Sequence, residues 1–199
     1  MTAYTVFGQG AAGSLQSDTQ DYTMGMQFTL SQPAALTGIW FNSATGAGAL
    51  PAACCIYQVT GAGTGSQVTG TVNTSPSWSA AAGSGWVKVT YDGSVTLTAS
   101  TNYKVCVFYG GGANWYSITA NYWSSGPGSG GITSGIITAP NNAGADQGQD
   151  TFHNPSAVLV YPDTSFNASN YWVDVEVTVA APPPPVTTGP QTYYSMRLS

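Results

Sequence analysis

The sequence SFNASNYWVDVEVTV, residues 165–179, alternates between apolar and polar side chains from Tyr171 onward. A period of two predicts a β-strand, with Tyr171 and the following valines on one face of a sheet. Asp174 and Glu176 fall on the opposite face, and they are two of only eight acidic residues in the chain. We therefore expect one dry face that packs in a core and one wet face that lies outside the sheet sandwich.

The folded domain is expected to end shortly after this strand. Four consecutive prolines, Pro182 to Pro185, follow Ala181, and proline cannot donate the hydrogen bonds of a sheet. The remaining sequence, VTTGPQTYYSMRLS, is too short to fold by itself. The sequence thus predicts one β-sandwich domain over residues 1–181 and a Pro-rich linker with a C-terminal docking arm over residues 182–199.

Short apolar stretches separated by glycine, proline, serine and asparagine precede the final strand, and no stretch has the period of a helix. This spacing favours an all-β fold, a sandwich or a barrel, and a two-sheet sandwich is preferred because it gathers long loops at one end. Residues 8–22 are expected to form a loop. The expected strands before the final one are residues 4–7, 24–30, 36–42, 53–60, 67–72, 85–91, 95–98, 102–109, 115–120 and 157–161.

The chain carries very few charges. Charged residues make up 6% of the sequence, and the net charge is -5. The only basic residues are Lys88, Lys104 and Arg197, too few to neutralise a run of phosphates. Binding to nucleic acid or to an anionic membrane is therefore not expected.

The N-terminal sequence MTAYTVFGQGAAGSLQ lacks the basic region and the continuous apolar run of a secretory signal. The initial methionine favours a protein that reaches its working place without the secretory route, and removal of a signal from the sequence is the other explanation. No apolar run approaches the roughly 18 residues that a membrane-spanning helix needs, so membrane insertion is not expected.

Three cysteines give an odd count without metal-site spacing. Cys54 and Cys55 are neighbours on an expected strand, so they face opposite sides and only one of them could approach Cys106. Buried free thiols are the first expectation, and a disulfide between Cys106 and one of the pair is the second.

The longest interruption of the strand pattern is residues 124–150, which are rich in glycine, asparagine, aspartate and glutamine and are flanked by aromatic residues. Long loops in compact domains are usually functional or held by a partner. Sugars pack on aromatic rings and take hydrogen bonds from amides and carboxylates, but the aromatics could equally cap the end of the sandwich. The candidate glycan-binding residues are Asn114, Trp115, Tyr116, Tyr122, Trp123, Asp146 and Asp150.

The sequence offers little for catalysis. The single histidine, His153, is not part of a nucleophile-elbow or zinc-binding motif. Asp146 and Asp150 could form a glycosidase pair or contribute to a calcium site, but they lie on a loop without calcium-binding spacing. We expect solvated loop acids, no metal, no cofactor and no enzymatic activity.

Three segments resemble a β-sandwich domain of unknown function that occurs in bacterial and actinobacteriophage proteins. They are GMQFTLSQPAALTGIWFN, GSGWVKVTYDGSVTLTASTNYKVCVFY and YPDTSFNASNYWVDVEVTV, within residues 24–179. The terminal Asn-Tyr-Trp-Val-Asp-Val motif is the most specific of these similarities. The resemblance implies a jelly-roll-like antiparallel sandwich in a noncatalytic binding or spacer role, beside polysaccharide-active enzymes or in phage minor tail and other virion proteins. The opening MTAYTVFG is similar to that of such virion proteins.

The C-terminal arm contains apolar residues and the chain's only arginine: Tyr193, Tyr194, Met196, Arg197 and Leu198. A proline-stiffened apolar arm can dock on a neighbouring protein as a strand or in a groove, and without a partner it would be a disordered end. A virion supplies many repeated neighbours, and multiple copies strengthen weak contacts.

These observations predict a noncatalytic structural protein of a phage virion, a minor tail protein or a capsid decoration. It would be present in many copies on the virion surface, bound to other virion proteins through its arm and to host-surface glycans through its exposed end. The alternative is an extracellular carbohydrate-binding module from a bacterial secreted system.

Overall fold

A computed structural model describes residues 1–110, 114–155 and 157–179, and the predicted docking arm lies outside these residues. The described chain is built from β-strands with one short 3-10 helix, Asn142–Gly144. No helix in this part of the chain is long and apolar enough to cross a membrane. The strands are β1 (Thr2–Tyr4), β2 (Ser14–Asp18), β3 (Tyr22–Leu30), β4 (Ala34–Ser43), β5 (Ala53–Gly61), β6 (Thr64–Gln67), β7 (Gly85–Thr90), β8 (Thr96–Leu97), β9 (Tyr103–Tyr109), β10 (Asn114–Ile118), β11 (Ile132–Ser134), β12 (Ile137–Ala139), β13 (Thr151–His153), β14 (Thr164–Ser165) and β15 (Val173–Val179).

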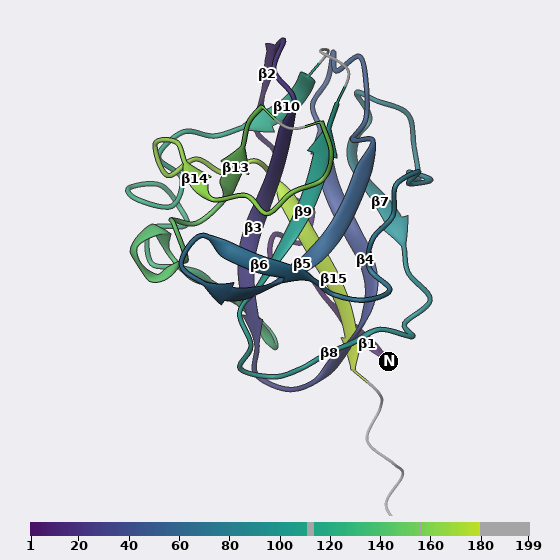
Figure 1. Cartoon of the computed structure of the whole chain (residues 1–199), viewed down its shortest axis with the longest axis vertical. Helices are drawn as coiled ribbons and strands as arrows, with labels where there is room; N and C mark the ends of the chain where they lie inside the picture. The colour runs from purple at the N-terminus through teal and green to yellow at the C-terminus, as the bar shows by residue number, and fades with distance from the viewer. Residues whose placement is uncertain (111–113, 156, 180–199) are drawn as a thin grey trace, which may run out of the picture.

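The strands form two packed antiparallel sheets, which confirms the predicted all-β sandwich (Figure 1). One sheet has the order β1-β15-β4-β7, with β8 also paired to β4. The other has the order β11-β12-β3-β9-β5-β6, with β13 paired to both β3 and β14. Strands β3 and β5 belong to one sheet and β4 to the other, as in a jelly roll. The loops that join these three strands therefore cross the ends of the sandwich.

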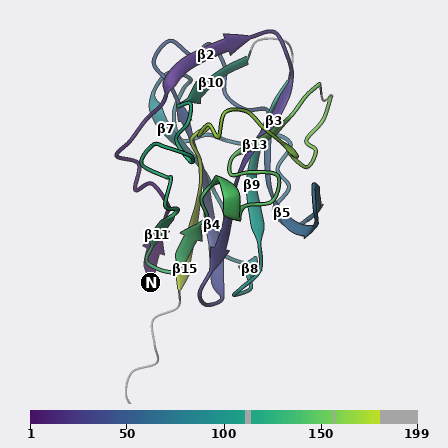
Figure 2. The same ribbon diagram turned by 90° about the vertical axis from the view of Figure 1, so that its left-hand side faces the viewer.

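A separate two-stranded sheet, β2 with β10, lies across one end of the molecule (Figure 2). In this sheet Tyr116 is opposite Gln16, and Ile118 is opposite Ser14. Strand β2 falls where the sequence predicted a loop, because the alternation in SLQSD is too short to be distinguished from loop composition. This small sheet forms one side of the candidate site described below.

The prediction that the final strand has a solvated face is wrong. Its inner face is dry as expected, since Val173, Val175 and Val177 are fully buried. Asp174 on the other face is also fully buried, and its carboxylate accepts hydrogen bonds from the backbone N–H groups of Val6 and Phe7, each at 2.9 Å. The N-terminal segment therefore covers the face that the acidic residues appeared to mark as solvated.

Glu176 lies on the same face and is also engaged. Its carboxylate forms an ion pair with Lys88 at 3.1 Å and accepts a hydrogen bond from Trp40 Nε1 at 3.1 Å. Lys88 and Trp40 lie opposite each other on β7 and β4. The alternation thus predicted the strand correctly but not the environment of its polar side.

Other strand boundaries differ from the expected ones where short segments depend on tertiary pairing. Residues 157–161 form no strand, although β11, β12 and β13 occur within and directly after the segment expected to be a long loop. Strand β6 ends at Gln67, where a strand was expected to begin. Strands of three or four residues have too little sequence periodicity to be recognised.

The three cysteines are free and buried, in agreement with the first expectation. Cys55 lies directly opposite Cys106 on strands β5 and β9. Cys54 belongs to the main core, whereas Cys55 and Cys106 pack with Tyr57 in a smaller cluster on the other side of the sheet.

Candidate functional site

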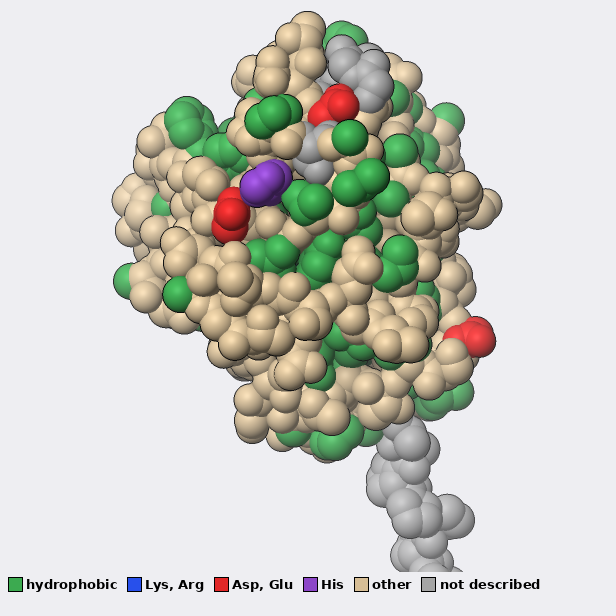
Figure 3. Space-filling view, viewed as in Figure 1, with side chains coloured by type: hydrophobic (Ala, Val, Ile, Leu, Met, Phe, Trp, Pro, Cys, Tyr) green, Lys and Arg blue, Asp and Glu red, His purple; other side chains and the backbone are tan. Residues whose placement is uncertain are grey.

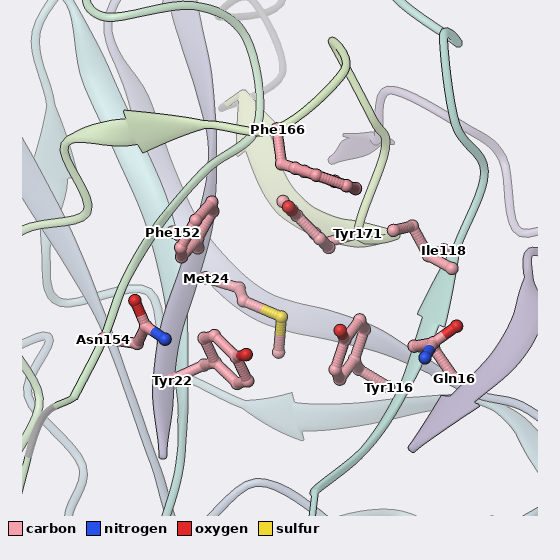
Figure 4. Close-up of a pocket in the computed structure, with 9 residues that line it drawn as sticks. All are labelled: Gln16, Tyr22, Met24, Tyr116, Ile118, Phe152, Asn154, Phe166 and Tyr171. Carbon is pink, nitrogen blue, oxygen red and sulfur yellow. The ribbon is translucent and has the colours of Figure 1, made fainter. Parts of the chain in front are cut away.

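A pocket of about 460 Å³ lies between the small β2–β10 sheet and the β13–β14 region (Figure 4). Its lining is mostly aromatic, with two side-chain amides. None of the described residues that line it carries a carboxyl, imidazole, thiol or amine group. They are Gln16, Tyr22, Met24, Tyr116, Ile118, Phe152, Asn154, Phe166 and Tyr171.

Strand register brings these side chains together. Tyr22 and Met24 are two residues apart on β3, so they share one face of the sheet. Phe152 on β13 lies opposite Met24. Tyr116 and Ile118 share a face of β10 by the same spacing. The pocket is therefore built from elements that are far apart in the sequence.

Four of the lining rings form a closed circuit that we call the aromatic box: Tyr22, Tyr116, Tyr171 and Phe152. Each ring makes edge-type contacts with two others, with centroids 5.8 to 6.3 Å apart. The Met24 thioether lies between these rings in Figure 4. Tyr116 and Tyr171 are 8% and 4% exposed, so the pocket opens mainly past Tyr22 and Phe152.

Phe166 is the apolar side chain of the pocket that is most open to water. It exposes 54% of its surface. Burying a large aromatic ring is favourable by roughly 1.5 to 3 kcal/mol. A ligand that covered the Phe166 ring would therefore gain part of this free energy. Gln16 and Asn154 contribute amide groups that can fix the orientation of a bound molecule.

A second group of aromatics, which we call the closed cluster, lies beneath the N-terminal segment. Its rings contact one another, with Phe7 and Trp172 centroids 5.1 Å apart and Tyr122 and Trp172 centroids 5.3 Å apart. Trp123 is 1% exposed. The members are Phe7, Trp86, Tyr122, Trp123 and Trp172.

Asp174 holds the cover of the closed cluster in place through its bonds to Val6 and Phe7. Burial raises the pKa of the Asp174 carboxyl to about 7, against the lowering effect of the backbone N–H groups that it accepts from. Asp174 thus has a structural role.

Lys104 anchors the loop that carries Asp146. Its side chain is fully buried, and Nζ donates to the carbonyl oxygens of Asp146 and Pro162, both at 3.0 Å, and to Thr151 Oγ1 at 2.9 Å. Burial lowers the pKa of Lys104, and the nearby Asp146 carboxylate, whose Oδ2 is 3.7 Å from Nζ, opposes this effect. Asp146 Oδ2 also accepts a 2.7 Å hydrogen bond from Tyr161.

Asp150 is buried beside the aromatic box. Its Oδ2 accepts a 2.9 Å hydrogen bond from the Tyr171 backbone N–H. Among the described residues, its Oδ1 has no hydrogen-bond partner; the Trp123 indole lies near enough to lower the pKa but misses hydrogen-bond geometry. Burial dominates and raises the pKa of Asp150 to about 8.

The predicted glycan-binding residues are thus separated by the fold. Tyr116 alone lines the pocket. Tyr122 and Trp123, expected to be exposed, are buried in the closed cluster, and Asp146 and Asp150, expected to be solvated, are anchored inside the structure. Trp115 lies next to Gly48, and Asn114 pairs through its backbone with Asp18.

Sequence reasoning missed most of the pocket. Phe152 is one of the aromatic residues that flank the long loop, but the sequence pattern gave no reason to select it, nor Gln16, Tyr22, Asn154 or Phe166. The YTMGM alternation in β3 could have indicated that Tyr22 and Met24 share a face. In the described part of the chain, no three His, Cys, Asp or Glu side chains gather as they would around a metal ion.

Comparisons with known proteins bear on the family. Neither the comparison with curated proteins nor that with solved structures found a match. The model of a domain of unknown function, DUF4082, matches residues 9–173 of the 199-residue chain. This match covers most of the sandwich, including every residue that lines the pocket. The chain therefore belongs to the DUF4082 family of domains of unknown function.

Proposed function

We propose that this chain is a noncatalytic binding protein that a phage particle displays on its tail or capsid, and that its pocket holds a host-surface glycan. The aromatic pocket is the observation that carries the proposal. Its nine lining side chains offer ring faces and amides, but none of the acids and bases that hydrolysis of a glycosidic bond uses.

The chemistry of the pocket suits a saccharide. Apolar C–H faces of a sugar pack on aromatic rings, while its hydroxyl groups exchange hydrogen bonds with amides and tyrosine hydroxyls. Phe166 offers an exposed ring, and Gln16 and Asn154 offer the amides. The pocket volume of about 460 Å³ lies in the range of small-ligand sites.

The virion setting is supported by the sequence. The opening MTAYTVFG resembles that of phage virion proteins, and the proline run at residues 182–185 leads to an apolar C-terminal segment. An arm that docks on other virion proteins would fix many copies of the sandwich on one particle. Repetition would then strengthen a weak contact between each pocket and the host surface.

A soluble carbohydrate-binding module from a bacterial secreted system is the second candidate. The observation that favours it is that the pocket is formed wholly within residues 16–171, so binding would need neither the arm nor a neighbouring copy. The two candidates differ in what residues 182–199 do.

Sedimentation of the full-length chain and of a chain that stops at Ala181, each with purified particles, separates these candidates. If only the full-length chain sediments with particles, the arm is an anchor and the virion proposal holds. If neither associates, the virion proposal fails.

A glycan array with both proteins tests the binding role. We expect both chains to bind the same glycans, and Tyr22→Leu to weaken this binding at least about tenfold because it removes one ring of the pocket. Tyr4→Leu, which replaces a half-buried tyrosine on β1, is the matched control. Binding that is unaffected by Tyr22→Leu, or the absence of any bound glycan, would exclude this pocket as a glycan site.

A further inference from the structure

The aromatic box has a geometry that differs from that of a flat stacking platform. Around the circuit, the planes of neighbouring rings meet at 69° to 77°. Tyr22 and Phe152 stand on one side, and Tyr116 and Tyr171 stand on the other (Figure 4). Rings that meet at steep angles form the walls of an enclosure. Such an enclosure fits a compact, rounded group better than the extended face of a sugar ring.

The inner surface of the box is polarizable. The Met24 side chain is 1% exposed, lines the pocket and lies between the four rings in Figure 4, so its thioether forms part of the inner surface of the enclosure. Sulfur and aromatic carbon are easily polarized and hold little bound water. A group that enters the box would lose hydration and gain contact with soft, electron-rich surfaces. This environment favours a weakly hydrated group.

The electrostatic surroundings favour a cation over an anion. None of the lining residues is basic, and both described lysines are engaged with carboxylates elsewhere, Lys88 with Glu176 and Lys104 with Asp146. The face shown in Figure 3 carries acidic side chains but, among its coloured residues, no lysine or arginine. The chain has a net charge of -5. Aromatic faces carry negative potential, so a cation enclosed by several rings is stabilised.

We propose that the aromatic box binds a quaternary ammonium group, of the kind found in choline, carried as a substituent on the glycan that the pocket holds. This inference rests on the proposed glycan-binding function and specifies the substituent that the site recognises. A quaternary ammonium is compact, cationic and weakly hydrated, and it cannot donate hydrogen bonds. Phe166 and the rim amides of Gln16 and Asn154 would contact the atoms that connect the ammonium to the sugar.

Titration of the full-length protein with choline chloride, followed by calorimetry or by tyrosine fluorescence, tests this inference. Sodium chloride at equal ionic strength is the salt control. The uncharged isostere 3,3-dimethylbutan-1-ol has the same shape without the charge. We expect choline to bind at least about tenfold more tightly than the isostere, because only the cation interacts with the ring quadrupoles.

Variants locate the binding in the box. Tyr22→Leu and Phe152→Leu remove half-buried walls and should each weaken choline binding about tenfold, whereas Tyr22→Phe keeps the ring and should preserve most of it. Tyr4→Leu should bind choline as the wild type does. Far-ultraviolet circular dichroism and denaturant midpoints verify that each variant is folded. Should Phe152→Leu lose its fold, Tyr22→Leu alone still tests the box.

The outcomes separate this inference from the proposed function. Equal affinity for choline and the isostere, or choline binding that survives in Tyr22→Leu, overturns the quaternary-ammonium inference. Unsubstituted glycans that bind while choline does not also overturn it and leave glycan binding standing. Binding of the protein to a choline-substituted polysaccharide is also compared with binding to phosphatidylcholine vesicles, since both carry the quaternary ammonium group. Retention on the vesicles alone overturns the assignment to a glycan.

Discussion

The closed cluster and the aromatic box contain the same kinds of side chain but differ in how far other residues cover them. Residues of the N-terminal segment cover the closed cluster, and Asp174 fixes that segment through hydrogen bonds to Val6 and Phe7. The aromatic box instead borders a pocket that Phe166 also lines, and Phe166 remains 54% exposed. What distinguishes the closed cluster from the pocket is the presence of a covering segment, not the composition of the aromatic group.

The largest effect that would test this comparison is expected in the closed cluster. Trp123→Ala removes a ring that is 1% exposed and leaves a cavity. We expect a loss of about 3 to 5 kcal/mol in the free energy of unfolding, measured by chemical denaturation. Phe166→Ala is the matched change beside the box. If Trp123→Ala were tolerated as easily as Phe166→Ala, the closed cluster would not be part of the core.

A comparable loss is expected when the loop anchor is removed. Lys104→Met removes the Lys104 hydrogen bond to the Asp146 carbonyl and leaves the Pro162 carbonyl with Thr151 Oγ1 as a donor, while the Asp146 carboxylate loses its ion pair. Breaking a buried pair in this way costs about 3 to 5 kcal/mol. Because Phe152 follows this loop, binding to the box should weaken as well. The measurements are the denaturant midpoint and the affinity for choline.

Lys88→Met is the control for the loop anchor. Its ion pair with Glu176 is partly exposed, with 24% of the lysine side chain accessible. Partly exposed pairs contribute below about 1 kcal/mol, so this variant should remain close to wild type. Equal destabilisation by both lysine variants would show that Lys104 has no special structural role.

For Asp150 we predict an effect on stability that depends on pH. Its pKa is about 8 in the folded protein and near 4 in an unfolded chain. Between these values the unfolded state releases a proton that the folded state keeps. The free energy of unfolding should therefore fall as pH rises from about 4 to about 8, by at most about 1.4 kcal/mol per pH unit from this group.

Asp150→Asn removes that titration. Its backbone φ of 53° is one that asparagine tolerates, so the variant should fold. We expect a flatter pH dependence, with the remaining slope due to Asp174, whose pKa of about 7 acts in the same direction. Thermal unfolding at several pH values measures this. An unchanged slope in Asp150→Asn would contradict the assignment.

The smallest change in stability is expected for Phe166→Ala. The ring is mostly exposed, so its loss should alter the free energy of unfolding by no more than about 0.5 kcal/mol. Binding to the pocket should nevertheless fall severalfold. Denaturation together with a glycan or choline titration measures both quantities. A variant that loses stability but keeps full affinity would reverse the roles assigned to the two regions.

The fold was largely predictable from the sequence, because long strands such as β3, β9 and β15 carry clear alternation and residue types that favour sheets. The short strands β12 and β13 were not, since they depend on pairing with the distant strand β3. The strand spacing indicated a sandwich or a barrel, with the sandwich preferred because it gathers long loops at one end, and the structure has the sandwich.

The candidate site was much less predictable. Loop composition suggested that Asp146 was solvated, yet it accepts hydrogen bonds from Tyr161 and Gly63. The residues next to Trp123 in the sequence have the composition of a loop, which suggested an exposed ring. Phe7, more than a hundred residues away in the sequence, packs against Trp123 instead. Tyr22 and Phe152 meet through the pairing of β3 with β13, which sequence spacing does not reveal. Which aromatics remain open is a property of tertiary structure.

Mapping of ligand-induced chemical-shift changes on the isotopically labelled full-length protein tests the account most directly. With choline or a glycan selected on the array, we predict changes concentrated at Tyr22, Phe152 and Phe166, with little change at Trp123 or Lys104. Changes centred on the closed cluster or on the loop around Asp146, with the box unaffected, would contradict the claim that the aromatic box is the binding site.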